Sequence, residues 1–373
     1  MQFSFFNLTA MRNEFGGNRL ANRTQHGLLS KSGTKTYQKP YSTMSSTTHN
    51  ALEKENIKYS PSEEDTRSQL HNNSHSKLSS KQPKFILTDK KPQRDLQGRK
   101  FPFDTSYSRD YITYLRRKEV DSMIGQDYLK SQREIDSSVR LVLIDWMLDM
   151  QKTLKFSLNT LFLSVLIVDR FLAHEQCKQD EFYLLGITSI LIASKCEDLK
   201  AAAISRDVLL NISENTITSN QLSDFEAYVL KSNYFRMGYV TLHTYLEKLS
   251  PVFTSEKNKQ ILHMLGILTL FQCQIASIRM STIAYCLLEV LQQVSQSPAF
   301  DEFLDRNEDF LNAQDYLDIQ VLSVEEQKLC FKHLHSLMFL VKVNNFEGLT
   351  RMFGHKLELI KLIEQNWLAL KYN

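Results

Sequence analysis

The segment that most restricts how this chain can fold is DEFYLLGITSILIASK, residues 180–195. Its apolar residues lie around nearly the whole circumference of a helix, and such a helix has to be buried by neighbours on every side. The chain therefore needs further helices packed around this segment. Its 373 residues leave ample length for that core, and only 11 Gly and 7 Pro argue against an all-β fold with many turns.

Helical periodicity is nearly continuous from Tyr107 onward, which predicts an all-α protein. A first helix is predicted over residues 107–118. Either Asp136 or Ser137 can cap the next helix, and Thr218 with Gln221 fits a capping box further on. A first helical set of five members is then predicted at residues 139–153, 159–173, 180–195, 204–211 and 218–232.

A second helical set is predicted after residue 240. Ser323 and Glu326 fit a capping box for one of its helices. Residues 297–322 interrupt the set as an acidic insertion with at most short helices. No sequence repeat relates the two sets, so the pattern alone does not show a duplicated fold. The predicted members are residues 240–249, 256–275, 281–296, 323–343 and 346–370.

The N-terminal 100 residues differ from the rest in composition and charge. They are rich in Ser, Thr, Asn, Gln and Lys, and their 17 Lys/Arg against 8 Asp/Glu give a charge of +9. Because the whole chain is +3, the other 273 residues carry 3 − 9 = −6. We predict a disordered tail. Its charge is compatible with a solvated segment, with nucleic-acid contact or with nuclear import.

The remaining composition points to an intracellular protein that is not an enzyme. The longest apolar stretches are too short to span a bilayer, and the first residues lack the pattern of a signal peptide. We interpret the cysteines as buried free thiols of a reducing compartment. We find no phosphate-binding glycine loop and no nucleophile elbow. We also find no metal-ligand spacing, because His333 and His335 point apart on a helix and cannot both bind one metal ion. We therefore expect no cofactor. The five cysteines are Cys177, Cys196, Cys273, Cys286 and Cys330.

Four motifs follow one another along the chain: VRLVLIDWMLDM (139–150), TLFLSVLIVDRFL (160–172), GITSILIASKCEDL (186–199) and FEAYVLKSNYF (225–235). Together they resemble the cyclin family. The resemblance is strong over residues 107–250 and weak afterwards. It implies two tandem five-helix cyclin boxes after an N-terminal helix. The domains would be a regulatory tail at 1–100, the N-terminal helix and first box at 101–236, and a divergent second box at 237–373.

The resemblance assigns Lys195 and Glu226 to kinase binding. Each is a charged residue at the border of an apolar helical face, where a polar group usually needs a partner. In cyclins the matching residues grip the backbone around the regulatory helix of the kinase. Tyr107 and Tyr111 share a face of the preceding helix, and they either pack on the kinase or pack on the protein itself.

Two further sets of residues take roles from the resemblance. Arg140 and Asp169 match a buried ion pair between helices, although helical periodicity also allows both to be exposed. A second set matches an exposed groove that receives Arg-x-Leu motifs of substrates or inhibitors. The alternative for these residues is ordinary core, which fits Leu143 well. The groove residues would be Val139, Val142, Leu143, Trp146 and Asp149.

The tail contains two motifs typical of timed degradation. Lys54, Glu55 and Asn56 form a KEN sequence, and Arg67 with Leu70 has the Arg-x-x-Leu form of a destruction box. An exposed tail is accessible to a ubiquitin ligase. Together with the box motifs, they favour a mitotic cyclin of the A or B type.

The function implied is that of a non-catalytic subunit that activates a cyclin-dependent kinase around G2/M, in nucleus and cytoplasm. One alternative is a cyclin-fold scaffold without kinase activation. Another is a transcription-factor-like adaptor that binds nucleic acid, which the −6 charge of residues 101–373 disfavours.

Overall fold

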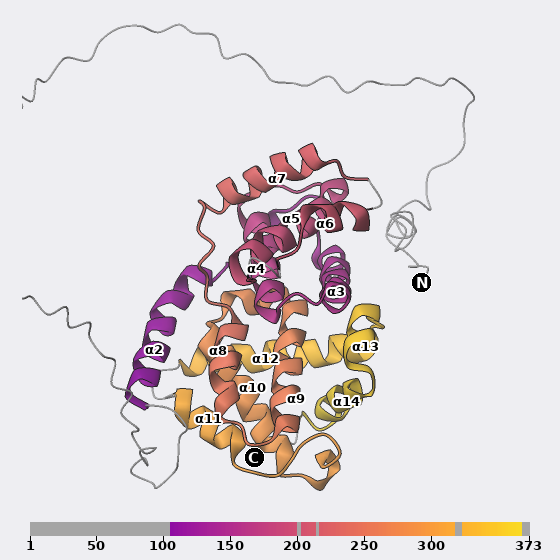
Figure 1. Ribbon diagram of the computed structural model, residues 1–373. Helices are drawn as coiled ribbons and strands as arrows, with labels where there is room; N and C mark the ends of the chain where they lie inside the picture. The colour runs from indigo at the N-terminus through magenta and orange to yellow at the C-terminus, as the bar shows by residue number, and fades with distance from the viewer. Residues whose placement is uncertain (1–104, 200–202, 214–215, 318–322, 368–373) are drawn as a thin grey trace, which may run out of the picture. The chain divides into compact units, whose positions relative to one another are not determined.

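The computed structural model describes residues 105–199, 203–213, 216–317 and 323–367. The KEN and Arg-x-x-Leu motifs of the tail lie outside the described residues. Within these ranges the regular structure is entirely helical and includes no strand, so the all-α prediction is confirmed (Figure 1).

The first helical set surrounds the central helix α5, Gln179–Glu197, as its all-round apolar sequence predicts. Every residue from Leu185 to Ser194 of α5 is buried, and helices α3, α4, α6 and α7 all contact it (Figure 1). The N-terminal helix α2, Thr105–Lys118, precedes the set and is followed by two short 3-10 turns, Glu119–Ser122 and Tyr128–Ser131. The other members are α3 (Ser137–Leu154), α4 (Leu158–His174), α6 (Arg206–Ile212) and α7 (Ser219–Ser232).

Side-chain caps fix where these helices begin. Asp136, rather than Ser137, caps α3, because its carboxylate accepts hydrogen bonds from the backbone N–H of Ser138 and Val139, both at 2.9 Å. The capping box predicted for α7 is present between Thr218 and Gln221. Ser323 caps α12 as predicted, but the carboxylate of Glu326 accepts a hydrogen bond from Arg279 N–H on a neighbouring segment.

The second helical set matches the predicted order, but two of its helices are shorter than expected. The helix predicted at 256–275 ends at Leu268, and the 3-10 turns Thr269–Phe271 and Cys273–Ser277 follow. The helix predicted at 346–370 is interrupted at Gly354, whose φ of 53° is left-handed. The members are α8 (Leu242–Leu249), α9 (Glu256–Leu268), α10 (Met280–Ser295), α11 (Asp309–Leu317), α12 (Val324–Val343), α13 (Glu347–Phe353) and α14 (Glu358–Gln365).

The acidic insertion is held to the start of α9 by Asp309. This buried carboxylate accepts hydrogen bonds from the N–H groups of Thr254 and Ser255, both at 2.9 Å, and from the Thr254 hydroxyl at 2.7 Å. Burial alone would raise the pKa of Asp309, but these hydrogen bonds outweigh burial and lower it. The insertion therefore covers one end of the second set, and its described part includes the nine-residue helix α11.

The cysteines are free thiols, but the prediction that all are buried is wrong for Cys196. This residue lies on the last turn of α5, where the helix leaves the core. Within the described ranges, no helix is both long enough and apolar enough to cross a membrane. The same residues contain no group of three or more His, Cys, Asp or Glu that could hold a metal ion.

Candidate protein-binding site

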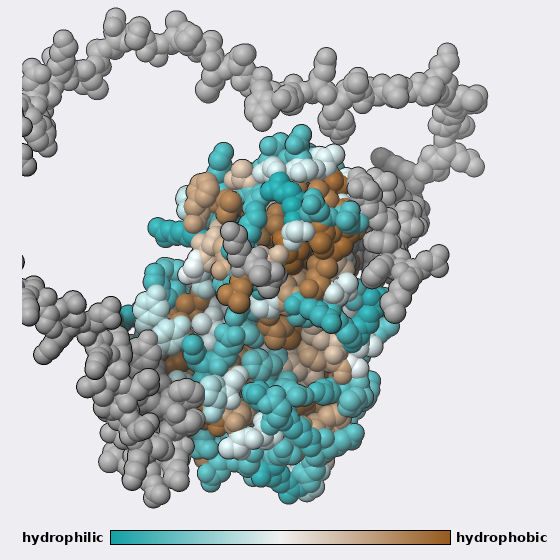
Figure 2. All heavy atoms as spheres, viewed as in Figure 1, coloured by the Kyte–Doolittle hydropathy of each residue, from teal (hydrophilic) through white to brown (hydrophobic). Residues whose placement is uncertain are grey.

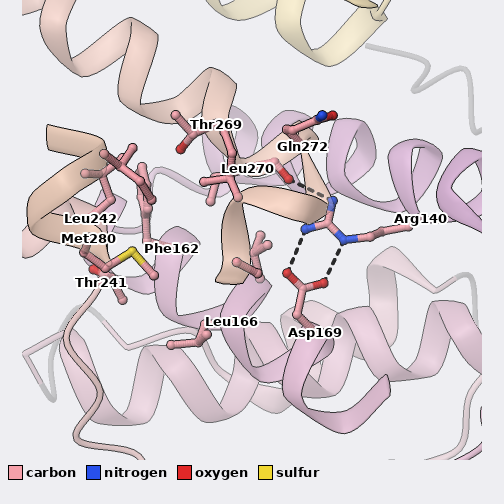
Figure 3. A pocket seen from close by; sticks show the side chains of 14 residues that line it. Arg140, Phe162, Leu166, Asp169, Thr241, Leu242, Thr269, Leu270, Gln272 and Met280 are labelled. Atoms are coloured by element: carbon pink, nitrogen blue, oxygen red, sulfur yellow. Dashed lines mark hydrogen bonds and ion pairs between the residues drawn. The ribbon is translucent and has the colours of Figure 1, made fainter. Parts of the chain in front are cut away.

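Arg140 and Asp169 form a buried, two-pronged ion pair between α3 and α4. Figure 3 shows the guanidinium facing the carboxylate, with Nε to Oδ1 and Nη2 to Oδ2 both at 2.7 Å. Their side chains are only 2% and 6% exposed. The structure thus brings the two residues together inside the molecule, where they cannot take part in binding a partner.

Neighbouring groups complete the surroundings of this pair. The third nitrogen of Arg140 donates to the carbonyl of Leu270 at 2.9 Å, and the Tyr128 hydroxyl donates to Asp169 at 2.7 Å. Burial alone would lower the pKa of Arg140, but Asp169 and Tyr128 raise it, so the guanidinium stays charged. Because Leu270 lies in the turn that ends α9 early, the pair also connects the two helical sets. The adjoining cavity of about 60 Å³ is too small for an organic ligand.

Lys195 and Glu226 are also brought together, but at the surface. Lys195 on α5 donates to one carboxylate oxygen of Glu226 on α7, and Arg206 at the start of α6 donates to the other at 2.9 Å. The side chain of Lys195 is 47% exposed, that of Arg206 31% and that of Glu226 12%. Three helices therefore converge on one carboxylate and present two cations beside it to solvent.

Arg206 was missed by the sequence prediction. It follows the N-cap Ser205, and its guanidinium also donates to the hydroxyl of Ser223, one turn before Glu226. Nothing in the helical periodicity points to this contact, because it joins side chains of two different helices, α6 and α7. The available signal was a cation at the first position of a helix. The helix dipole is positive at that end and disfavours a positive charge, so Arg206 is expected to have an acidic partner.

Two exposed aromatic residues, Tyr234 and Phe235, lie where α7 ends. They are 73% and 66% exposed and adopt left-handed backbone angles, with φ of 53° and 55°. Such angles are unfavourable for bulky residues and often accompany functional sites. Figure 2 shows apolar side chains at the surface of the part formed by α4 to α7, whereas the opposite end of this view is mainly hydrophilic. Leu199, just beyond Lys195 and α5, is exposed as well.

The two predicted tyrosines lie on α2. Tyr107 is within the helix, but its side chain lies outside the described residues. Tyr111 is half-buried against the core, and the ammonium of Lys248 on α8 lies 5.0 Å from its ring centre. The ring of Tyr111 therefore contacts the protein's own second helical set.

The predicted groove residues on α3 have different exposures. Leu143 is fully buried beneath Gly186 of α5, where a Cβ would lie 2.7 Å from a Leu143 methyl group. Val139, Val142 and Trp146 are half-buried, and the Trp146 ring lies 4.7 Å from that of Tyr183. Asp149 forms an ion pair at 2.7 Å with Arg351 of α13. Leu143 thus belongs to the core, whereas the other four residues line the surface of α3.

The first helical set is similar in sequence to a known protein family. Residues 110–238, from α2 through the segment after α7, match the family described as the cyclin N-terminal domain. The described part of this chain is therefore an all-helical protein with a segment similar to the cyclin N-terminal domain, and the resemblance to cyclins is confirmed over that segment.

Similar curated proteins are A- and B-type cyclins. Cyclin-B2-1 of Oryza sativa subsp. japonica is 30% identical over 181 residues, 48% of this chain and 43% of that protein. Putative cyclin-A3-1 of Arabidopsis thaliana is 35% identical over 147 residues, 39% of this chain and 41% of that protein. The G2/mitotic-specific cyclin-B of Arbacia punctulata is 34% identical over 135 residues, 36% of this chain and 32% of that protein. The chain therefore spans less than half the length of these relatives.

Among solved structures, the viral cyclin from Herpesvirus saimiri is 18% identical, with a TM-score of 0.48, and the match covers 62% of this chain and 97% of that one.

Proposed function

We propose that this chain is a regulatory subunit that binds and activates a cyclin-dependent serine/threonine kinase in cell-cycle control. The observation that carries the proposal is the surface cluster of Lys195, Arg206 and Glu226, which lies in the segment similar to cyclins. In cyclins, the residues that match Lys195 and Glu226 bind backbone groups of the kinase. Three of the similar curated proteins are named G2/mitotic-specific cyclins, which favours action around G2/M.

The surface cluster suits the binding of backbone groups. A lysine ammonium donates to carbonyl oxygens, and a carboxylate accepts from backbone N–H groups. The ion pair keeps the two side chains in place before the partner arrives, which reduces the entropy lost on binding. The exposed aromatic residues Tyr234 and Phe235 supply apolar area, as is common at protein interfaces.

Activation requires no chemistry from this chain. A kinase is active when a glutamate of its regulatory helix pairs with the lysine that holds the ATP phosphates. A subunit that binds only that arrangement shifts the kinase population toward it. The free energy of the shift is the difference in affinity for the two kinase states.

The test compares kinase binding by wild type and the Lys195→Ala, Glu226→Ala double variant. The tagged full chain is co-purified with a cyclin-dependent kinase, and the bound histone-kinase activity is measured. We expect the double variant to lose most of it. A matched control is Lys342→Ala, Glu364→Ala, which removes an ion pair of similar exposure on α12 and α14.

Three outcomes separate the possibilities. Loss of activity in the double variant but not in the control supports the proposal. Equal activity of the folded double variant and wild type contradicts it. Binding without any rise in activity, already in the wild type, instead favours the alternative of a cyclin-fold scaffold.

A further inference from the structure

Helix α13 is attached to α3 through the carboxylate of Asp145. The backbone N–H groups of Gly348 and Leu349 each donate to one oxygen of this buried carboxylate, at 3.0 Å. A Cβ on Gly348 would lie 2.2 Å from the carbonyl oxygen of Asp145, so this close approach requires glycine. These contacts hold the short helix against α3, and Figure 1 shows the two helices side by side.

From this position Arg351 reaches Asp149 one turn further along α3. Its Nη1 lies 2.7 Å from Asp149 Oδ2, and its Nη2 lies 2.8 Å from Oε2 of Glu347 in its own helix. Lys152, also on α3, donates to the backbone carbonyl of Arg351 and is a second contact between the two helices. The Asp149 side chain is only 19% exposed, and its negative charge is paired with Arg351 of the same chain.

Asp149 lies at the end of the half-buried stripe on α3. Trp146 and Val142 are three and seven residues before it, on the same helix face. An acidic group next to apolar side chains is suited to a peptide with one basic and one apolar residue. Arg351-Met352-Phe353 is a segment of this kind, and its arginine occupies the acidic end.

We propose that Arg351 is a specificity-determining residue that excludes arginine-containing peptides from the α3 face. A peptide arginine can pair with Asp149 only by displacing Arg351. Val142 and Trp146 stay partly accessible, so the exclusion acts through charge rather than by covering the whole face. This inference goes beyond the proposed kinase binding and rests on the sequence-based prediction that the α3 face is a docking groove.

The test is fluorescence-anisotropy binding of a labelled peptide with an Arg-x-Leu-Phe core to the full chain. Arg351→Ala should bind it about fivefold more tightly than wild type. This factor corresponds to the loss of one competing ion pair whose free energy is near the upper end of the range for surface pairs. Arg306→Ala is the matched control, because it removes an equally exposed arginine paired with Asp301. Adding Asp149→Asn to Arg351→Ala should return the affinity to that of wild type.

Each result bears on the proposal. A gain in Arg351→Ala alone, reversed by Asp149→Asn, supports it. Equal affinity of wild type and Arg351→Ala, whether high or undetectable, overturns it. Arg351→Gln keeps the aliphatic stem and replaces the alanine variant if thermal unfolding shows a loss of structure. Kinase co-purification from the same preparations tests the proposed function separately, because Lys195 and Glu226 are intact in every variant.

Discussion

The ion pairs Arg140–Asp169 and Lys195–Glu226 have similar chemistry in opposite surroundings. The first is almost inaccessible to solvent. Each of its residues makes a further hydrogen bond, Arg140 to the Leu270 carbonyl and Asp169 to the Tyr128 hydroxyl. The second lies on the surface, and its carboxylate is shared with Arg206. A charge inside a protein is there only because its partner is present, whereas a surface charge can exchange one partner for another. The difference separates a pair that maintains the fold from one that can bind a partner.

The largest expected effect comes from breaking the inner pair. Arg140→Ala leaves the carboxylate of Asp169 buried without its counter-charge and leaves the carbonyl of Leu270 without a donor. We expect unfolding free energy to fall by about 3–5 kcal/mol, measured by urea denaturation. Replacing both residues by apolar ones, as in Arg140→Met with Asp169→Leu, should cost less than the single change. A loss below about 1 kcal/mol for Arg140→Ala would contradict the structural role given to this pair.

Two histidines of the second helical set, one buried and one half-buried, allow the interior to be tested by pH. His243 on α8 contacts Asn159 of α4 at 2.8 Å, and its ring lies 5.4 Å from that of His263 on α9. Burial lowers the pKa of both, from 6.5 to about 4. The unfolded chain therefore binds more protons than the folded one, so stability is complete above about pH 6.5 and falls as pH drops toward 4.

We expect this loss to be about 2–3 kcal/mol per histidine at pH 4. Urea unfolding at a series of pH values measures it, and His243→Gln should flatten the pH dependence by removing one of the two groups. Asp309, whose pKa is lowered, adds its own loss only at still lower pH. Equal stability at pH 7 and pH 4.5 would show that these rings are not buried in solution.

The smallest expected effect on stability comes from replacing Arg206, which tests the surface pair Lys195–Glu226. Arg206→Ala should change unfolding free energy by less than about 1 kcal/mol, because the side chain is partly exposed. It should nevertheless weaken kinase binding about threefold to fivefold, since the carboxylate of Glu226 loses the group that orients it. Titration calorimetry with the kinase subunit measures the affinity.

Two companion variants distinguish orientation from simple structural support. Arg206→Lys keeps a cation near Glu226 and should recover part of the affinity. Ser223→Ala removes the second contact of Arg206 and should weaken binding slightly. If Arg206→Ala binds the kinase as tightly as wild type while the Lys195→Ala, Glu226→Ala variant does not, Arg206 has no part in the site.

The helices were predictable because their signals are local. An apolar residue recurring every three or four positions, or a capping side chain three residues from its N–H partner, acts within one or two turns. This is why α3 to α7 and the Thr218 cap agree with the prediction. The predicted helix at 346–370 failed at Gly354, where a single left-handed residue outweighs the continuing apolar pattern.

The site was predictable in part, through motifs. The cyclin-like motifs predicted Lys195 and Glu226 as site residues, and the structure joins the two across α5 and α7. Arg206 and Arg351 were not identified, because their partners Glu226 and Asp149 lie 20 and 202 residues away in the sequence. Leu270 could not be identified either, since its carbonyl reaches Arg140 only because α9 ends early.

The sequence by itself therefore determined that this protein is helical, that residues 180–195 lie at the centre of the first helical set and that residues 107–250 resemble a cyclin. The tertiary structure decided which charges are interior, which are shared at the surface, and that Arg351 reaches Asp149. Periodicity specifies the face of a helix but not the helix that covers it. Contacts between distant segments arise only when the helices pack, because packing sets both the distances between charges and the water that remains around them.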